Sequence, residues 1–299
     1  MRTLYLNETA SMKKAILIHN PTAGSGDHNK KDLQKEAQKW GYTIDYYSTV
    51  ALWWERFVHK EPDLFFVAGG DGTVQKFISE ILGAKNDSLE QVPIQILPYG
   101  TANNIAKTLG INDPEEVLRA TTNSIKFDIG KVKGIPDSIF FIEGIGCGIF
   151  PRLVLNMKSK DEDEKQDEIE QSLKELLKII DTYQAREAIV IADKEEITGR
   201  FLLLELMNIR YIGPNIELAP GAETGDGRFE LVIVREEARN ELRSYIQDHL
   251  DHKISPSQLA DFAELRKVEE VRMKWKGEDL HVDDKIIEKY KGEDRKSVV

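Results

Sequence analysis

The sequence predicts two domains: an N-terminal α/β domain with a mostly parallel sheet, and a C-terminal domain of mostly antiparallel strands. Two observations support this fold class. In the first half, short apolar runs alternate with helical patterns, which is typical of a parallel sheet covered by helices. From Phe127 on, strand-like runs follow one another directly and only two helical patterns interrupt them. We therefore expect domains at 1–128 and 129–299, with the last residues able to return to the first.

The elements of each half follow from periodicity and from turn residues. In the first half, Asp27 predicts the N-cap of a helix that runs to Trp40 and ends at Gly41, and Asp113-Pro114 predicts the start of another. Strands are expected there at 16–19, 43–47, 65–68 and 94–97. The second half predicts helices at 167–183 and 237–250, and strands at 127–132, 139–146, 187–192, 198–207, 229–235, 268–275 and 279–283. The charged run between them, 158–167, predicts a solvated loop or helix start.

Composition excludes several classes of protein. The 299 residues carry 41 basic and 52 acidic side chains, a net charge of −11, which argues against a nucleic-acid partner and against strong adsorption to anionic lipid. The single cysteine, Cys147, allows no internal disulfide. No signal peptide and no apolar run of membrane-spanning length is visible. We expect a soluble, cytoplasmic protein without a transmembrane segment.

The most informative string is Gly69-Gly70-Asp71-Gly72-Thr73, between an apolar run and a helical pattern. A strand that ends in a glycine turn and continues into a helix leaves backbone N–H groups aimed at a phosphate. Two more strand-like runs end in the same kinds of residue, at Asn20 to Gly26 and at Tyr99 to Asn104. In α/β proteins, ligands bind in a crevice at the carboxyl ends of the parallel strands, so three strand ends of this kind are expected to form one ligand site. The pattern predicts a nucleotide phosphate site and phosphoryl transfer.

Together, three strings resemble the diacylglycerol kinase catalytic-domain superfamily, which includes the bacterial soluble lipid kinases and the sphingosine and ceramide kinases. They are Asn20-Pro21-Thr22-Ala23-Gly24, Gly69-Gly70-Asp71-Gly72-Thr73 and Pro98-Tyr99-Gly100-Thr101-Ala102-Asn103-Asn104. The resemblance implies an ATP- and Mg-dependent kinase acting on a lipid hydroxyl at the membrane surface, diacylglycerol by default. Its active site would lie in the cleft between the domains, and membrane contact would be peripheral and transient. The sequence leaves a homodimer open.

The resemblance also implies roles for individual residues. Nucleotide would be bound by Asn20, Gly24, Thr49, Gly69, Gly70, Asp71, Gly72, Thr73, Gly100, Thr101 and Asn104. Asp71 would also act in catalysis by orienting metal and nucleotide. A structural metal would be held by Asp226 with carbonyls near Glu223 and Arg228, although Asp-Gly before a strand is equally a good turn.

The general base is where this sequence departs from the bacterial relatives, which carry Asp-Gly-Glu near the C-terminus. Here Asp283 matches the Asp, Asp284 stands in place of Gly, and Lys285 stands in place of Glu. Asp283 is the expected base, with Asp284 or Glu288 as alternatives and impaired catalysis as a third. A soluble-substrate kinase of the NAD-kinase type also remains open, because it shares the glycine string.

Three other features have simpler explanations. Trp53-Trp54 with Phe57 could dip into a bilayer, but a helix that covers the sheet would use them equally, and that interpretation is preferred. His249 and His252 are expected to be solvated rather than to bind zinc. Gly144 to Gly148 predicts close strand packing, with Cys147 as a small buried side chain.

Overall fold

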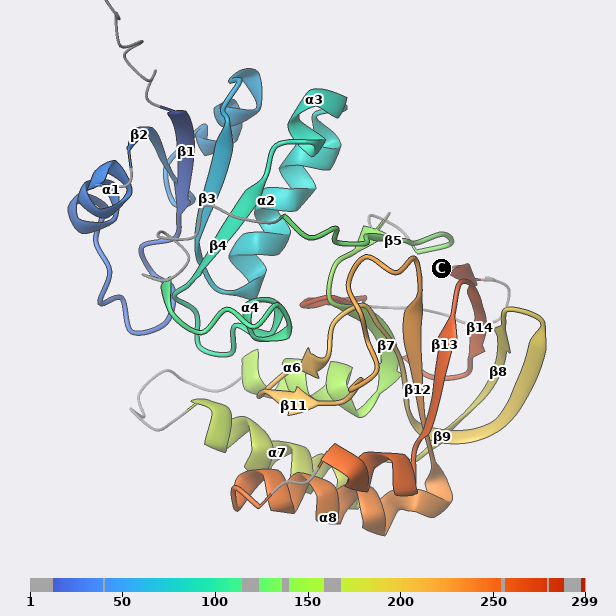
Figure 1. The fold of residues 1–299 in the computed structure, drawn as a ribbon. Helices are drawn as coiled ribbons and strands as arrows, with labels where there is room; N and C mark the ends of the chain where they lie inside the picture. The colour runs from blue at the N-terminus through green and yellow to red at the C-terminus, as the bar shows by residue number, and fades with distance from the viewer. Residues whose placement is uncertain are drawn as a thin grey trace, which may run out of the picture. The chain divides into compact units, whose positions relative to one another are not determined.

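A computed structural model describes residues 13–39, 41–114, 124–135, 140–158, 168–253, 256–278, 280–287 and 297–298 (Figure 1). These residues form two compact units. One contains the chain up to residue 106 and residues 110–124, and the other contains residues 107–109 and the chain from residue 125 on. No helix among the described residues is both long enough and apolar enough to cross a bilayer.

The first unit is built on a four-stranded sheet in which every pair of neighbours is parallel, in the order β2-β1-β3-β4. Its strands are β1 (Lys13–His19), β2 (Tyr42–Ser48), β3 (Leu64–Gly69) and β4 (Ile94–Pro98). The connecting helices are α1 (Lys30–Lys39), η1 (Trp54–His59), α2 (Asp71–Gly83), α3 (Asp87–Glu90) and α4 (Asn104–Thr108). All four predicted strands of this half are present.

Successive side chains of a strand point to opposite faces of the sheet, so each face has its own core. Leu33 and Ala37 of α1 pack with Phe66 of β3 on one face. On the other face, the ring centres of Phe65 in β3 and Phe77 in α2 are 5.0 Å apart.

The expected N-cap at Asp27 is wrong, because α1 begins three residues later and the Asn29 side chain accepts the N–H of Asp32. Trp40 and the helix expected after Pro114 lie outside the described residues.

The second unit contains one large, mostly antiparallel sheet (Figure 1). The 13-residue strand β9 is its centre: the first half pairs with β8, and the second half lies between β7 and β12. The strands of this sheet are β7 (Gly144–Gly148), β8 (Arg186–Ala192), β9 (Glu195–Met207), β12 (Phe229–Arg235), β13 (Glu264–Val268), β14 (Val271–Trp275), β15 (Leu280–Val282), β16 (Lys285–Ile286) and β17 (Ser297–Val298). Two small pairs complete the unit, β5 (Gly130–Lys131) with β6 (Phe140–Phe141), and β10 (Tyr211–Ile212) with β11 (Ile216–Glu217). The predicted fold class is confirmed.

Three helices of this unit lie next to one another, with α7 between α6 and α8 (Figure 1). They are α6 (Ile149–Lys158), α7 (Glu168–Thr182) and α8 (Arg239–Leu250), and two short 3-10 turns are η2 (Glu236–Ala238) and η3 (Pro256–Asp261). The sequence predicted α7 and α8 but missed α6. Its β-branched and aromatic residues and Pro151 hide a helix, although proline is tolerated in a first helical turn. β13 was also missed, since charged side chains interrupt its apolar pattern.

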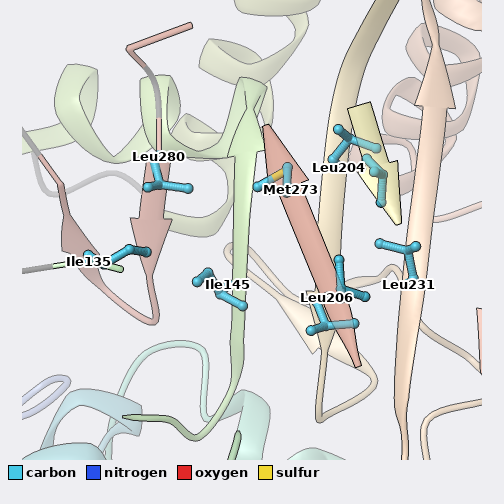
Figure 2. A pocket seen from close by; sticks show the side chains of 9 residues that line it. Ile135, Ile145, Leu204, Leu206, Leu231, Met273 and Leu280 are labelled. Atoms are coloured by element: carbon cyan, nitrogen blue, oxygen red, sulfur yellow. The ribbon is translucent and has the colours of Figure 1, made fainter. Parts of the chain in front are cut away.

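Side chains from six strands of this sheet meet one another and Ile135, which lies outside the strands (Figure 2). The cavity between them has a volume of only about 20 Å³, so these side chains form a closely packed core. The lining residues are Ile135, Ile145, Val190, Leu204, Leu206, Leu231, Val271, Met273 and Leu280.

Cys147 is buried as expected. His249 is buried as well, which corrects the expectation of a solvated side chain: its ring bonds the Tyr245 carbonyl, and burial lowers its pKa.

Candidate active site

The glycine bend at the end of β3 forms the N-terminus of α2. Gly70 is the N-cap residue, and its carbonyl accepts the N–H groups of Thr73 and Val74. Among the described residues, nothing accepts a hydrogen bond from the Gly72 N–H, as expected for the second residue of a helix. The helix dipole adds partial positive charge at the same point. This end of α2 can therefore bind an anion.

A second turn packs directly against this bend. Gly100, which follows β4, lies so close that a Cβ added there would overlap the Cα of Gly70, and a Cβ on Gly70 would lie 3.0 Å from the Cα of Gly100. Asn103 fixes the Gly100 turn, because its side chain accepts the Gly100 N–H and donates to the Gly100 carbonyl. Only glycine at both positions lets the two backbones approach this closely.

The loop after β1 is tied to the same bend. The Asn20 N–H donates to the Ala68 carbonyl of β3, and its side-chain amide donates to the Thr73 hydroxyl at 3.2 Å. The Asn20 side-chain oxygen accepts from both the N–H and the hydroxyl of Thr22. Strand ends that are far apart in sequence thus meet at one edge of the sheet, as the sequence predicted.

These turns enclose a pocket of about 430 Å³, within the usual range for small-molecule sites. It is lined by Asn20, Thr22, Ala23, Gly24, Thr49, Val50, Gly70, Gly72, Thr73, Lys76 and Gly100. Seven of the eleven predicted nucleotide-binding residues are among them. The other four do not line it: Gly69, Asp71, Thr101 and Asn104.

Lys76 is the one charged side chain among the described residues that line this pocket. Its ammonium lies 4.9 Å from the centre of the Trp54 ring, which favours a cation. Lys76 was not among the residues predicted to bind the nucleotide, although the sequence contains a signal for it. Lys76 follows Thr73 by three residues on the helix that the glycine bend opens, so both side chains extend to the same side.

The carboxylate of Asp71 is directed to α4. Its two oxygens accept the N–H groups of Asn104 and Ile105, at 2.8 and 2.9 Å. Burial raises the pKa of Asp71, and these N–H groups act in the opposite direction because they stabilise the charged form. Asp71 therefore positions the start of α4 and, through it, the Gly100 turn. Its predicted catalytic and nucleotide-binding roles stay predictions.

A chain of hydrogen-bonded rings, two of them buried, ends at the pocket-lining loop. His19 Nδ1 bonds the Tyr46 hydroxyl, His19 Nε2 bonds His28 Nδ1 at 2.8 Å, and His28 Nε2 bonds the Ala23 carbonyl. With both imidazoles neutral, the Tyr46 hydroxyl donates to His19, His19 to His28, and His28 to Ala23. Burial, and to a lesser extent the neighbouring His28, lower the pKa of His19 to about 4. His19 is therefore neutral near pH 7, and the chain holds the loop by hydrogen bonds.

In the second unit, Asp283 lies at the turn between β15 and β16, with φ of +51°. Its carboxylate is buried and accepts the N–H groups of Ile142, Glu143 and Gly144 at 2.8–3.1 Å. Asp283 thus anchors the backbone that leads into β7, and three donors already engage the group expected to accept a proton. Asp284 and Lys285 are exposed, and Glu288 lies outside the described residues.

A buried ion pair lies beside this turn. His281 Nε2 is 2.9 Å from a Glu205 oxygen, and His281 Nδ1 bonds the Asp283 carbonyl. The two side chains belong to strands on either side of β7, and Gly146 is opposite both. A Cβ on Gly146 would overlap the Glu205 carboxylate, so glycine makes the pair sterically possible. Burial by itself lowers the pKa of His281, but the Glu205 carboxylate outweighs it and raises the pKa to about 9.

The predicted structural-metal residues lie in one loop before β12. The Asp226 side chain accepts the Arg228 N–H at 2.9 Å. The Lys267 ammonium lies 3.1 Å from a Glu223 oxygen and 3.3 Å from an Asp226 oxygen. A cation of the protein itself balances both carboxylates, and the described residues contain no cluster of three metal-ligating side chains. The donor set fits an ammonium better than Mg²⁺, so the metal role of Asp226, Glu223 and Arg228 stays a prediction.

Comparison with known proteins shows what this chain is similar to. Residues 14–132 match the diacylglycerol kinase catalytic domain. This part of the chain is similar to the catalytic domain of the diacylglycerol kinases. The chain is 28% identical to a diacylglycerol kinase of Bacillus subtilis over 243 residues, covering 75% of this chain and 74% of the relative. It is 26% identical to one of Staphylococcus aureus, covering 77% and 73%.

The fold is similar to that of a solved structure. A crystal structure of a diacylglycerol kinase from Bacillus anthracis matches with a TM-score of 0.64 at 17% identity, covering 96% of this chain and 93% of that chain. The catalytic domain is that of a lipid kinase, and this class of enzyme uses a nucleotide substrate and, in general, a divalent metal.

Proposed function

We propose that this lipid kinase transfers the γ-phosphoryl group of ATP to the hydroxyl of diacylglycerol, with Mg²⁺ as the metal. The observation that carries the proposal is the pocket at the N-terminus of α2, where backbone N–H groups and the Lys76 ammonium face one space. An anion with several negative charges suits such a site, because the dipole, the N–H groups and the ammonium all favour negative charge. The names of the relatives support diacylglycerol as acceptor.

In the proposed reaction, the lipid hydroxyl oxygen forms a bond to the γ-phosphorus while the bond from that phosphorus to the bridging oxygen breaks, leaving ADP. The Gly72 N–H and Lys76 would stabilise charge on the phosphates. Mg²⁺ supplies further charge stabilisation when bound. No carboxylate lines the pocket among the described residues, so the phosphates themselves and water would be its main ligands, with the Asn20 and Thr73 oxygens nearby.

The lipid proton needs an acceptor, and Asp283 is the residue proposed for it. Three backbone N–H groups donate to its carboxylate and fix its position. A loose transition state requires only late deprotonation of the hydroxyl, so one carboxylate is sufficient. The proposed domains are 1–128 and 129–299.

One assay tests this function. Purified protein with radiolabelled ATP and Mg²⁺ is supplied with detergent-dispersed diacylglycerol, ceramide or sphingosine, or with NAD. Formation of labelled phosphatidic acid from diacylglycerol supports the proposal. Transfer to NAD alone would show a soluble-substrate kinase, and transfer only to another lipid would correct the acceptor.

A second candidate has specific support. Lys285 replaces the glutamate of the bacterial relatives, and the Asp283 carboxylate is engaged by three N–H groups. Both observations favour a protein that binds nucleotide and lipid but has lost turnover. ATP binding in calorimetry, together with no transfer to any acceptor, would establish this alternative.

A further inference from the structure

The loop between β2 and η1 exposes apolar side chains beside the nucleotide pocket. Val50, Leu52 and Trp53 are 63%, 88% and 66% exposed. Single exposed apolar residues are common, but three within four residues, one of them a tryptophan, mark an interaction site. Val50 also lines the pocket described above.

The same segment sends its next aromatic residues inward. Trp54 and Phe57 are buried, with stacked rings, and Phe57 stacks on Phe77 of α2. The two adjacent tryptophans therefore have opposite roles. Trp54 anchors the segment in the core, and Trp53 is held outside it.

The loop is also fixed in shape. The Ala51 N–H donates to the Ser48 carbonyl and the Arg56 N–H to the Trp53 carbonyl. Trp53 has φ of +65°, a left-handed conformation that is unusual for a bulky residue. Backbone held in such a conformation is a sign of function when the surroundings maintain it.

The charges next to the loop identify the partner. The Arg56 guanidinium lies 5.3 Å from the centre of the Trp53 ring, and His59 and Lys60 follow at the end of η1. Glu55 is the acidic residue of η1, and Lys60 is 3.9 Å from Asp45. An exposed tryptophan and leucine flanked by arginine and lysine suit the interface of a bilayer, where rings lie at headgroup depth and cations meet phosphates.

We infer that Leu52 and Trp53 insert into the surface of a lipid bilayer, with Arg56 at the level of the phosphate groups. The inference rests on the proposed function, since the acceptor resides in a membrane. It also answers how a chain of net charge −11 reaches that membrane. Insertion of these apolar side chains attaches the protein to the membrane, and the negative net charge of the protein weakens its binding to anionic lipid.

Co-sedimentation with phosphatidylcholine vesicles containing one quarter phosphatidylglycerol tests the inference with the full chain. The double variant Leu52→Ser/Trp53→Ser should reduce vesicle partitioning at least 10-fold, while Ile125→Ser, which alters a side chain of 61% exposure elsewhere, should leave it unchanged. Vesicles should shift the tryptophan emission of the wild type to shorter wavelength, and Trp53→Phe should remove that shift. Unchanged partitioning of the double variant, or a persistent shift in Trp53→Phe, would overturn the inference.

Two further measurements exclude other occupants. The double variant should retain the wild-type dissociation constant for ATP and the wild-type mass in analytical ultracentrifugation. Weaker ATP binding would assign the loop to the nucleotide, and a lower mass would assign it to a second copy of the chain; either result overturns the inference. Partitioning onto vesicles does not require turnover, so the two proposals can be tested separately. A protein that binds vesicles but transfers no phosphate would contradict the proposed kinase function and still support membrane insertion of this loop.

Discussion

Lys76 and Thr73 are three residues apart on α2, so their side chains reach the same pocket at the end of the helix where the backbone N–H groups are exposed. A lysine is a compact charge on a flexible stem and can follow a phosphate group as it moves. Its position over the Trp54 ring keeps the ammonium near the pocket before a ligand arrives. At this site, backbone and side chain contribute charge of the same sign.

Replacing Lys76 tests that contribution. We expect Lys76→Gln to raise the dissociation constant for ATP about 10-fold, equivalent to about 1.4 kcal/mol, because one charge-assisted contact is lost. Lys76→Arg should retain most of the affinity. Calorimetric titration with ATP measures both variants. Lys39→Gln on α1 is the control, since that lysine is exposed and forms an ion pair with Glu36. An unchanged dissociation constant in Lys76→Gln would remove Lys76 from the site.

Asp71 has a different kind of role, because its carboxylate positions the backbone at the start of α4. Asp71→Asn keeps the shape but turns one acceptor into an amide that faces an N–H donor of α4. We expect turnover to be abolished in a variant that still folds, with stability reduced by about 1–3 kcal/mol. Activity assays and urea unfolding measure the two effects, with Asp87→Asn as a control. If Asp71→Asn keeps most of its activity, its assigned role is wrong.

Among the elements, β7 shows why a glycine string need not be a ligand site. Gly146 is flanked on the neighbouring strands by His281 and Glu205, and the missing side chain provides the space in which these two meet. The pair in turn supports the Asp283 turn through the Asp283 carbonyl. A buried ion pair of this kind is costly to disrupt, since removing one partner leaves an uncompensated charge.

Gly146→Ala should therefore destabilise the protein by about 3–5 kcal/mol, because the added methyl group displaces the Glu205 carboxylate. The matched control is Gly83→Ala at the end of α2, where a Cβ meets nothing within 4 Å. There we expect no loss, or a gain of about 0.5 kcal/mol. Urea unfolding gives both values. Equal stability of the two variants would contradict the space-filling argument.

At the scale of the whole molecule, stability should depend on pH through the same pair. The pKa of His281 is about 9 in the folded chain and near 6.5 when unfolded. A raised folded-state pKa contributes stability that is fully present below pH 6.5 and is lost as pH rises through 9. Burial also raises the pKa of Glu205, which acts with the same sign.

We therefore expect the free energy of unfolding to fall between about pH 7 and pH 10, and to fall less in His281→Gln, which lacks the titrating ring. Urea unfolding followed by circular dichroism across this range measures the difference. Stability that rises through pH 9, or identical profiles for the two proteins, would show that His281 does not carry the pH dependence.

The fold class and the pocket at the glycine bend could be predicted from the sequence because both rest on local patterns. Strand, glycine turn and helix are adjacent along the chain from Phe65 to Phe77, and no distant residue has to be known to recognise them. Helix α6 was missed because its local preferences favour strand, and packing against α7 and β7 outweighs them.

The sequence by itself determined the parallel and antiparallel halves, the glycine bend and the three strand ends that form the pocket. Only the tertiary structure decided where side chains point. It turned Asp71 to α4, placed Lys76 in the pocket, sent Trp54 into the core while Trp53 stayed outside, and joined Glu205 to His281 across 76 residues. The physical reason is that backbone preferences are local, whereas burial and pairing depend on partners that the fold brings together from distant parts of the chain.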